Sequence, residues 1–368
     1  DIDIGLRAAL SSAELLRIVA EALPRFDIGN AVIAFACAAK LDNGKEMATL
    51  EPSSAWSALQ ERLLTCAEEL EPRGMSMTAY SAARLMWGDE ALLSSLARAG
   101  VRRSFDFGAT DIAKACWAFA KLRHVDEPMA ASFWSSMSRE APRVIRSARF
   151  VDVSMIGWAF ALSDKGNNDL FAEISSATRI ACDTLAPRSL ASISWSCARA
   201  SYKDRRLFAA LAERASLVAD EFTAHDISAF CWAFAAAGEA SPDLFNALAV
   251  HLVSAGLLAR LSPSLAAELA AAFAGAGVFH AALFEELEKL CVDHIADLET
   301  EDVVGFAWAF ATAGWKSSKT VDAISAYAAR FAERLRPVER QMLSWAIAGQ
   351  HPTGVQREGL SFTSSPIQ

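Results

Sequence analysis

The sequence is short of charged residues, and of positive charge in particular. Only 21% of its 368 residues are Asp, Glu, Lys or Arg, 53% are apolar, and the mean hydropathy is +0.21. A chain of this composition buries more helix surface than an ordinary amphipathic pattern requires. Its net charge of -9 argues against a generic polyanion binder and against adhesion to an anionic membrane.

Motifs for catalysis and metal binding are also missing. The sequence has no G-x-x-x-x-G-K-[ST] phosphate loop, no strand-borne G-x-G-x-x-G and no H-E-x-x-H, and its histidines form no triad-like pattern. Cys291 and His294 share one side of a helix in "CVDH" without an evident third ligand, so burial is preferred to a metal site. We therefore expect no enzymatic activity, no cofactor, no bound metal and no small-molecule substrate.

The seven cysteines are odd in number and form no C-x-x-C, which predicts buried thiols in a reducing compartment rather than a disulfide framework. No signal or transit peptide can be read after Asp1, and we expect that an N-terminal segment was cleaved or left out. The apolar stretch 265–284 is long enough to span a bilayer. Glu268 and His280 interrupt it and it keeps the register of the repeat described next, so we expect packed helices and no membrane span.

The chain repeats one phrase. "WAFA" occurs four times, each time with an aspartate six residues before the tryptophan, at Asp111, Asp152, Asp226 and Asp302. Weaker copies begin at 189, 265 and 339, which puts the Trp-equivalent positions at 117, 158, 195, 232, 271, 308 and 345, with spacings of 41, 37, 37, 39, 37 and 37. Two degenerate copies begin at 27 and, less clearly, at 76. Such a register indicates a repeat protein.

Each unit is interpreted as two helices. The first opens with the aspartate as N-cap and closes near a glycine or a polar break. The second carries its own apolar stripe, as at 244–252, and Pro128 and Pro242 stand where proline is best tolerated, at the helix start. Stacked helix pairs of this length predict an all-α fold, an α-solenoid. We divide it into degenerate N-terminal repeats (1–104), a regular solenoid (105–349) and a polar C-terminal tail (350–368) that extends onto a neighbour or stays disordered.

A helical wheel separates the roles within the first helix. Ile112, Cys116 and Phe119 share the core face, whereas Trp117 lies about 140° from Ile112. We interpret the repeated tryptophans as filling the gaps between units, in preference to stacking on bases. They are Trp117, Trp158, Trp195, Trp232 and Trp308.

The residues three and ten positions after each aspartate form one narrow strip on the helical wheel. Their identities change from repeat to repeat, whereas the residues around them are repeated. Either an exposed strip has drifted, or the array reads a sequence-like ligand one unit at a time. The strip consists of Lys114 and Lys121, Met155 and Leu162, Ser192 and Arg199, Ala229 and Ala236, Glu268 and Gly275, and Gly305 and Thr312.

Charge is unevenly distributed along the chain. Residues 101–206 have 16 basic and 11 acidic residues, whereas 1–100 and 207–368 are both acidic. Arg139, Arg143 and Arg146 share one side if that segment is helical, and such a stripe could follow phosphates. A solvated helix face explains any one cluster more simply, but a basic middle on an acidic molecule is harder to explain in that way.

The "D-[IV]-x-x-x-x-W-A-F-A" units at 111–123, 152–164, 226–238 and 302–314 resemble the octotricopeptide and heptatricopeptide repeat families of organellar RNA-binding proteins in algae and protists. The resemblance covers roughly 105–349. It implies a right-handed stack with the first helices inside, holding single-stranded RNA and serving RNA processing, stability, translation or an organellar ribosome. The acidic excess and the lack of a C-terminal RAP domain depart from that pattern.

Two hypotheses therefore stand: an organellar RNA-binding solenoid that contacts single-stranded or ribosomal RNA, and a scaffold subunit that contacts mainly other proteins. The expected location is the mitochondrial matrix or the chloroplast stroma, with the mitochondrion preferred. If RNA is bound, the candidate contacts are Lys114, Lys121, Arg123, Arg143, Arg146, Ser192, Arg199 and Lys203.

Overall fold

The computed structural model describes residues 2–41, 50, 53–124 and 128–348. Within these residues the chain forms nineteen α-helices and six short 3-10 helices and no strand, which confirms the all-α solenoid expected from the repeat. Two compact units divide the chain, Asp1–Ala177 and Thr178–Gln368, and each is described by itself.

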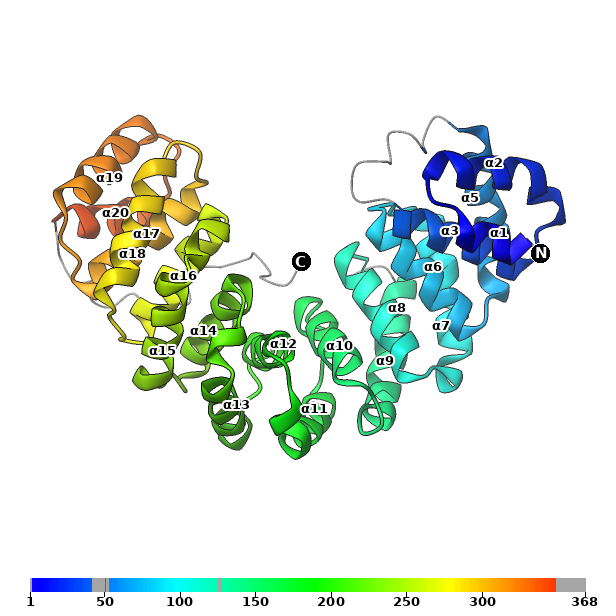
Figure 1. Cartoon of the computed structure of the whole chain (residues 1–368), viewed down its shortest axis with the longest axis horizontal. Helices are drawn as coiled ribbons and strands as arrows, with labels where there is room; N and C mark the ends of the chain where they lie inside the picture. The colour runs from blue at the N-terminus through cyan, green and yellow to red at the C-terminus, as the bar shows by residue number, and fades with distance from the viewer. Residues whose placement is uncertain (1, 42–49, 51–52, 125–127, 349–368) are drawn as a thin grey trace. The chain divides into compact units, whose positions relative to one another are not determined.

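In both units the helices alternate between two rows, and within a unit most helices pack against the helix two places further along the chain (Figure 1). In the first unit, the row of first helices comprises α1 (Ile2–Ala8), α3 (Ile28–Leu41), α6 (Pro72–Arg84), α8 (Ala109–Lys121) and α10 (Phe150–Leu162). The row of second helices comprises α2 (Ser12–Ala22), α5 (Ser54–Cys66), α7 (Glu90–Arg102) and α9 (Pro128–Ile145), and α11 (Asn168–Ala181) crosses the division between the units.

The second unit repeats the arrangement. Its first helices are α12 (Pro187–Arg199), α14 (Ala224–Ala237), α16 (Pro263–Gly275), α18 (Thr300–Ala313) and α20 (Pro337–Ala348). Its second helices are α13 (Arg205–Leu217), α15 (Pro242–Ser254), α17 (Ala281–His294) and α19 (Ser318–Arg330). The 3-10 helices follow second helices, at Leu23–Arg25, Ala67–Glu69, Ser104–Asp106, Cys182–Thr184, Ala219–Glu221 and Leu257–Arg260.

A left-handed residue ends the first helix in seven successive repeats. It lies six residues after the Trp-equivalent position, and it keeps the spacing of the repeat. The next residue donates its amide to a carbonyl five residues back, as Glu239 does to Phe234 and Trp315 to Phe310, which is the Schellman closure of a helix. The seven residues are Met86, Arg123, Asp164, Ser201, Gly238, Gly277 and Gly314. Met86 shows that the doubtful copy at 76 is a true repeat, and it moves the register of that copy two residues earlier, so that the Trp-equivalent position is Tyr80.

The repeated aspartate is not an N-cap, and that prediction was wrong. The N-caps of α8, α10, α14 and α18 are Gly108, Arg149, Thr223 and Glu299, so each aspartate is the third residue inside its helix. There it remains close to the positive end of the helix dipole. It also reaches the preceding first helix, through Ser76 Oγ–Asp111 (2.9 Å), Thr110 Oγ1–Asp152 (3.0 Å), Arg188–Asp226 (3.7 Å) and Ser264 Oγ–Asp302 (2.6 Å).

The tryptophans pack between repeats, as predicted. In the first unit the Trp117 ring centroid lies 5.0 Å from Tyr80 and 6.2 Å from Trp158, and in the second Trp195 lies 6.1 Å from Trp232. Trp158, Trp195 and Trp308 are buried, and Trp117 and Trp232 are half-buried. Ile112, Cys116 and Phe119 form the core face of α8 as expected.

The long apolar stretch is divided between helices, because α16 ends at Gly275 and α17 begins at Ala281. No helix in the described part of the chain has the length and apolar character needed to cross a membrane. All seven cysteines are free thiols, and only Cys37 is more than slightly exposed. Burial raises the pKa of Cys116, and that of Cys197 to about 12.

The division at 177 separates two compact units and does not test the boundary expected at 104, which was drawn between degenerate and regular repeats. The boundary at 104 therefore stays a prediction. The handedness of the stack and the inner place of the first helices stay predictions too. The expected tail at 350–368 lies outside the described residues.

Candidate nucleic-acid interface

The sequence-predicted RNA contacts fall into three places. Lys114 and Lys121 lie on α8, and Arg123 lies in the turn after it. Arg143 lies on α9, in the other row of the same unit, and Arg146 lies in the turn directly after it. Ser192 and Arg199 lie on α12 and Lys203 in the turn after it, all in the second unit.

The α8 surface combines cations with aromatic rings. Lys114 Nζ lies 6.0 Å from the centroid of the Tyr80 ring, which itself packs on Trp117. Lys121 is half-buried at the end of α8, and Arg123 is exposed at φ 55°. We use the name α8 surface for Tyr80, Lys114, Trp117, Lys121 and Arg123.

Tyr80 and Arg84 were missed at the sequence level, although a signal was present. Tyr80 occupies the Trp-equivalent position of the copy at 76, and exposed Arg84 precedes Lys121 by one 37-residue repeat. Assigning that copy to the regular register would have placed both residues beside Trp117 and Lys121. Since cations and half-buried rings suit phosphates and unstacked bases, these two residues extend the candidate interface onto α6.

Arg143 and Arg146 already have partners within the protein, which departs from their expected role as phosphate contacts. Arg143 donates to the carbonyl oxygens of Phe105 and Phe107 at 3.1 Å. Arg146 donates two hydrogen bonds of 2.8 Å to Glu173, which join the turn after α9 to α11 and lower the pKa of Glu173. A phosphate would have to displace these contacts, so both arginines serve first as ties between elements.

In the second unit the strip is less exposed than the helical wheel suggested. Ser192 is 4% exposed, so the prediction that this side chain faces a ligand was wrong. The equivalent residues Ala229, Glu268 and Gly305 are buried as well. The cause is the close approach of successive first helices, which leaves the position three after the aspartate at a helix–helix contact. Arg199 and Lys203 remain exposed.

The chemistry available is that of binding. Among the described residues no group of three or more His, Cys, Asp or Glu side chains is placed to hold a metal ion. What the structure offers instead is charge and aromatic surface at the ends of first helices, on a rigid two-row framework.

A comparison with protein-family models decides the family. Residues 151–351 match the model of the RNA-editing substrate-binding complex 6 protein (RESC6), over more than half of the chain. The chain belongs to this family. No curated protein matches it.

The RESC6 match extends from α10 to the end of α20. It includes Ser192, Arg199 and Lys203 and leaves out the α8 surface. The RESC6 family is distinct by name from the octotricopeptide and heptatricopeptide families, so that finer resemblance is not confirmed, while the helical-repeat architecture is. The family name refers to an RNA-editing complex, and nothing in it supports a ribosomal role.

Proposed function

We propose that this protein is a non-catalytic subunit of an RNA-editing substrate-binding complex and acts in mitochondrial RNA processing. The observation that carries the proposal is the family match over residues 151–351, which corresponds to a continuous series of helix pairs. The chloroplast alternative gains no support from this match.

The main role we assign to the solenoid is that of a scaffold that contacts other protein subunits. Both rows of helices present repeated surfaces on which several partners can bind side by side. Residues 207–368 carry 10 basic and 19 acidic residues, which favours protein contacts over phosphate contacts in most of the second unit.

The test is purification of the tagged full-length protein from mitochondria, followed by identification of the proteins and RNAs that accompany it. We expect a constant set of RNA-processing proteins together with mitochondrial transcripts. Purification with ribosomal proteins alone, or absence of the protein from mitochondria, would contradict the proposal.

A second role, direct contact with single-stranded RNA, is favoured by the α8 surface and by Arg199 and Lys203. The change of Lys114, Lys121 and Arg199 together to Ala should weaken RNA binding and reduce the slope of log affinity against log salt by up to about 3 units, roughly one per lost phosphate contact. A matched control changes the exposed residues Arg260, Lys289 and Lys319 to Ala. Equal effects in the two triple variants would reject this RNA contact and leave the scaffold role intact.

A further inference from the structure

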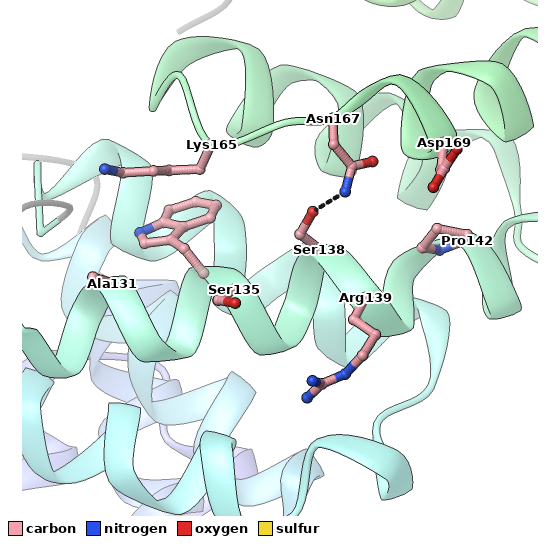
Figure 2. A pocket seen from close by; sticks show the side chains of 9 residues that line it. Ala131, Ser135, Ser138, Arg139, Pro142, Lys165, Asn167 and Asp169 are labelled. Carbon is pink, nitrogen blue, oxygen red and sulfur yellow. Dashed lines mark hydrogen bonds between the residues drawn. The ribbon is translucent and has the colours of Figure 1, made fainter.

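A pocket of about 600 Å³ opens between α9 and the turn from α10 to α11, within the first unit. Ser135, Ser138 and Arg139 come from α9, and Lys165, Asn167 and Asp169 come from the turn and the start of α11 (Figure 2). None of these residues belongs to the α8 surface, and Arg139 alone belongs to the arginine stripe that the sequence suggested for phosphates.

The pocket lies where the array departs from its regular length. The repeat that contains α8 and α9 is longer than those that follow it, with 41 residues between Trp117 and Trp158 where 37 is the commonest spacing. The buried pair Phe133–Trp134 follows the left-handed residue Arg123 by ten positions, whereas Leu170–Phe171 follows Asp164 by six. The additional residues precede this pair, because α9 begins five residues before Phe133 whereas α11 begins two residues before Leu170. Ala131, which lines the pocket, is the first residue after this extension of α9.

One pair of side chains fixes the shape of the pocket. Asn167 Nδ2 donates to Ser138 Oγ at 2.8 Å, and Asn167 Oδ1 accepts the amide of Leu170 at 2.9 Å. The Asn167 side chain therefore caps the start of α11 and also joins the turn before it to α9. Ser138 is buried and Asn167 is exposed, so this hydrogen bond lies at the edge of the pocket, where it ties the two walls together.

The other lining side chains carry charges or hydrogen-bonding atoms. Lys165 extends along the wall above Ala131 and Ser135, and Arg139 leaves α9 one residue beyond Ser138 (Figure 2). The Arg139 side chain is 66% exposed, and its ion pair with Glu140 is long, at 3.7 Å. Ser135 is exposed, and Asp169 provides an acceptor at the far end. Two cations therefore accompany several short hydrogen-bonding groups.

We propose that this pocket binds one or two nucleotides of single-stranded RNA. Arg139 and Lys165 hold backbone phosphates, while Ser135 and Asp169 bond to a base edge or a 2′-hydroxyl. The Trp134 ring takes no part in stacking, because it is 1% exposed and its indole nitrogen donates to the His124 carbonyl. A protein side chain fits less well, since peptide anchors prefer deep apolar pockets and six of the nine lining residues are polar or charged.

The proposal rests on the RNA-processing role proposed above but concerns a different surface from the α8 surface. The test measures fluorescence anisotropy of labelled 12-nucleotide U-rich and A-rich RNAs with the full-length protein. One variant changes Arg139 and Lys165 to Ala, and a second, Ser135→Trp, fills the pocket without a change of charge. The control changes Arg260 and Lys289, which are exposed and belong to the second unit, to Ala.

We expect binding to weaken about tenfold in the Arg139/Lys165 variant and severalfold in Ser135→Trp, with the control within twofold of the unchanged protein. The salt slope should fall by about 2 units in the Arg139/Lys165 variant alone. Thermal unfolding should be unchanged, because none of the three altered side chains is buried.

If the Arg139/Lys165 variant only matches the control, or if Ser135→Trp binds RNA as the unchanged protein does, the pocket is not an RNA site. Loss of a co-purifying protein with RNA affinity intact would assign the pocket to a protein partner and reject the proposal. If the unchanged protein enters the RNA-editing complex but binds no RNA, this inference fails and the scaffold function stands.

Discussion

The Ser264 hydroxyl donates a 2.6 Å hydrogen bond to the Asp302 carboxylate and so joins α16 to α18. The same position in the first unit joins α8 to α10, where Thr110 Oγ1 donates to Asp152 at 3.0 Å. The aspartate recurs because it connects neighbouring repeats and also favours the start of a helix. Its carboxylate performs both tasks because position N3 faces the preceding first helix.

A double-mutant cycle measures this tie. Thr110→Val and Asp152→Asn should each lower stability. The cost for Asp152→Asn should be about 1–3 kcal/mol, because Asp152 is buried and also accepts a hydrogen bond from Arg149. The coupling between the two changes should exceed about 0.5 kcal/mol. Hydrogen exchange of the α8 and α10 amides is the measurement, and additive effects would show that the hydrogen bond contributes no coupling.

Stability of the second unit should fall as pH rises. Glu268 is buried on α16, and burial together with the nearby Asp302 carboxylate raises its pKa from 4.5 to about 8. Since the folded pKa lies above the unfolded value, the stabilisation is complete below pH 4.5 and is lost progressively up to pH 8, at no more than about 1.4 kcal/mol per pH unit.

Thermal melting of Glu268→Gln at pH 5, 7 and 9 tests this dependence. The variant should melt near the unchanged protein at pH 5 and above it at pH 9, because glutamine stays neutral. Glu285→Gln, an exposed change on the neighbouring α17, is the control. A constant difference in melting temperature across the pH range would rule out Glu268 as the titrating group.

The left-handed residues give a matched pair of substitutions. Met86→Gly should raise stability by up to about 1 kcal/mol, because a side chain at φ 52° is strained and glycine is not. Gly314→Ala should lower it by about 1 kcal/mol, although no atom lies within 4 Å of the added Cβ. Chemical denaturation monitored separately for each unit tests both signs, and a destabilised Met86→Gly would show that its side chain contributes more than its strain costs.

The tryptophans should differ in their contribution to stability. Trp308 is 7% exposed, so Trp308→Ala should cost about 3–5 kcal/mol. Trp232 is half-buried against Trp195, and its replacement should cost less. Melting temperatures of the two variants provide the comparison, and a larger effect at Trp232 would indicate that the ring pair matters more than burial.

Much of the fold could be predicted from the sequence, because a repeat constrains every copy at once. The 37-residue register, the helix pairs, the prolines at the starts of α9 and α15 and the glycine closures of α14 and α18 all follow from local rules that do not depend on distant contacts. The N-cap was misplaced because Asp at N3 and Asp at N-cap both favour a helix start, and only the helix bounds distinguish them.

The site was less predictable, since exposure depends on how closely helices approach each other. The helical wheel treats Lys114 and Ser192 as equivalent, yet Lys114 is half-buried and Ser192 is buried. The partner of Arg146 is Glu173, which lies 27 residues further along the chain on α11, so no periodicity in the segment around Arg146 reveals it. The pocket depends on how the turn before α11 packs on α9, and no pattern within either segment reveals that contact.

Because most of the thiols are buried, their reaction with a labelling reagent can be used to follow unfolding. Six of the seven cysteines are buried, and Cys37 alone is half-buried. A thiol-specific dye added to the native protein should react first at Cys37, slowly because burial raises the pKa of that thiol as well. Cys66 and Cys116 belong to the first unit, and Cys182, Cys197, Cys231 and Cys291 to the second. Mass spectrometry of the order in which these six thiols become labelled would therefore show which unit opens first, without any engineered probe.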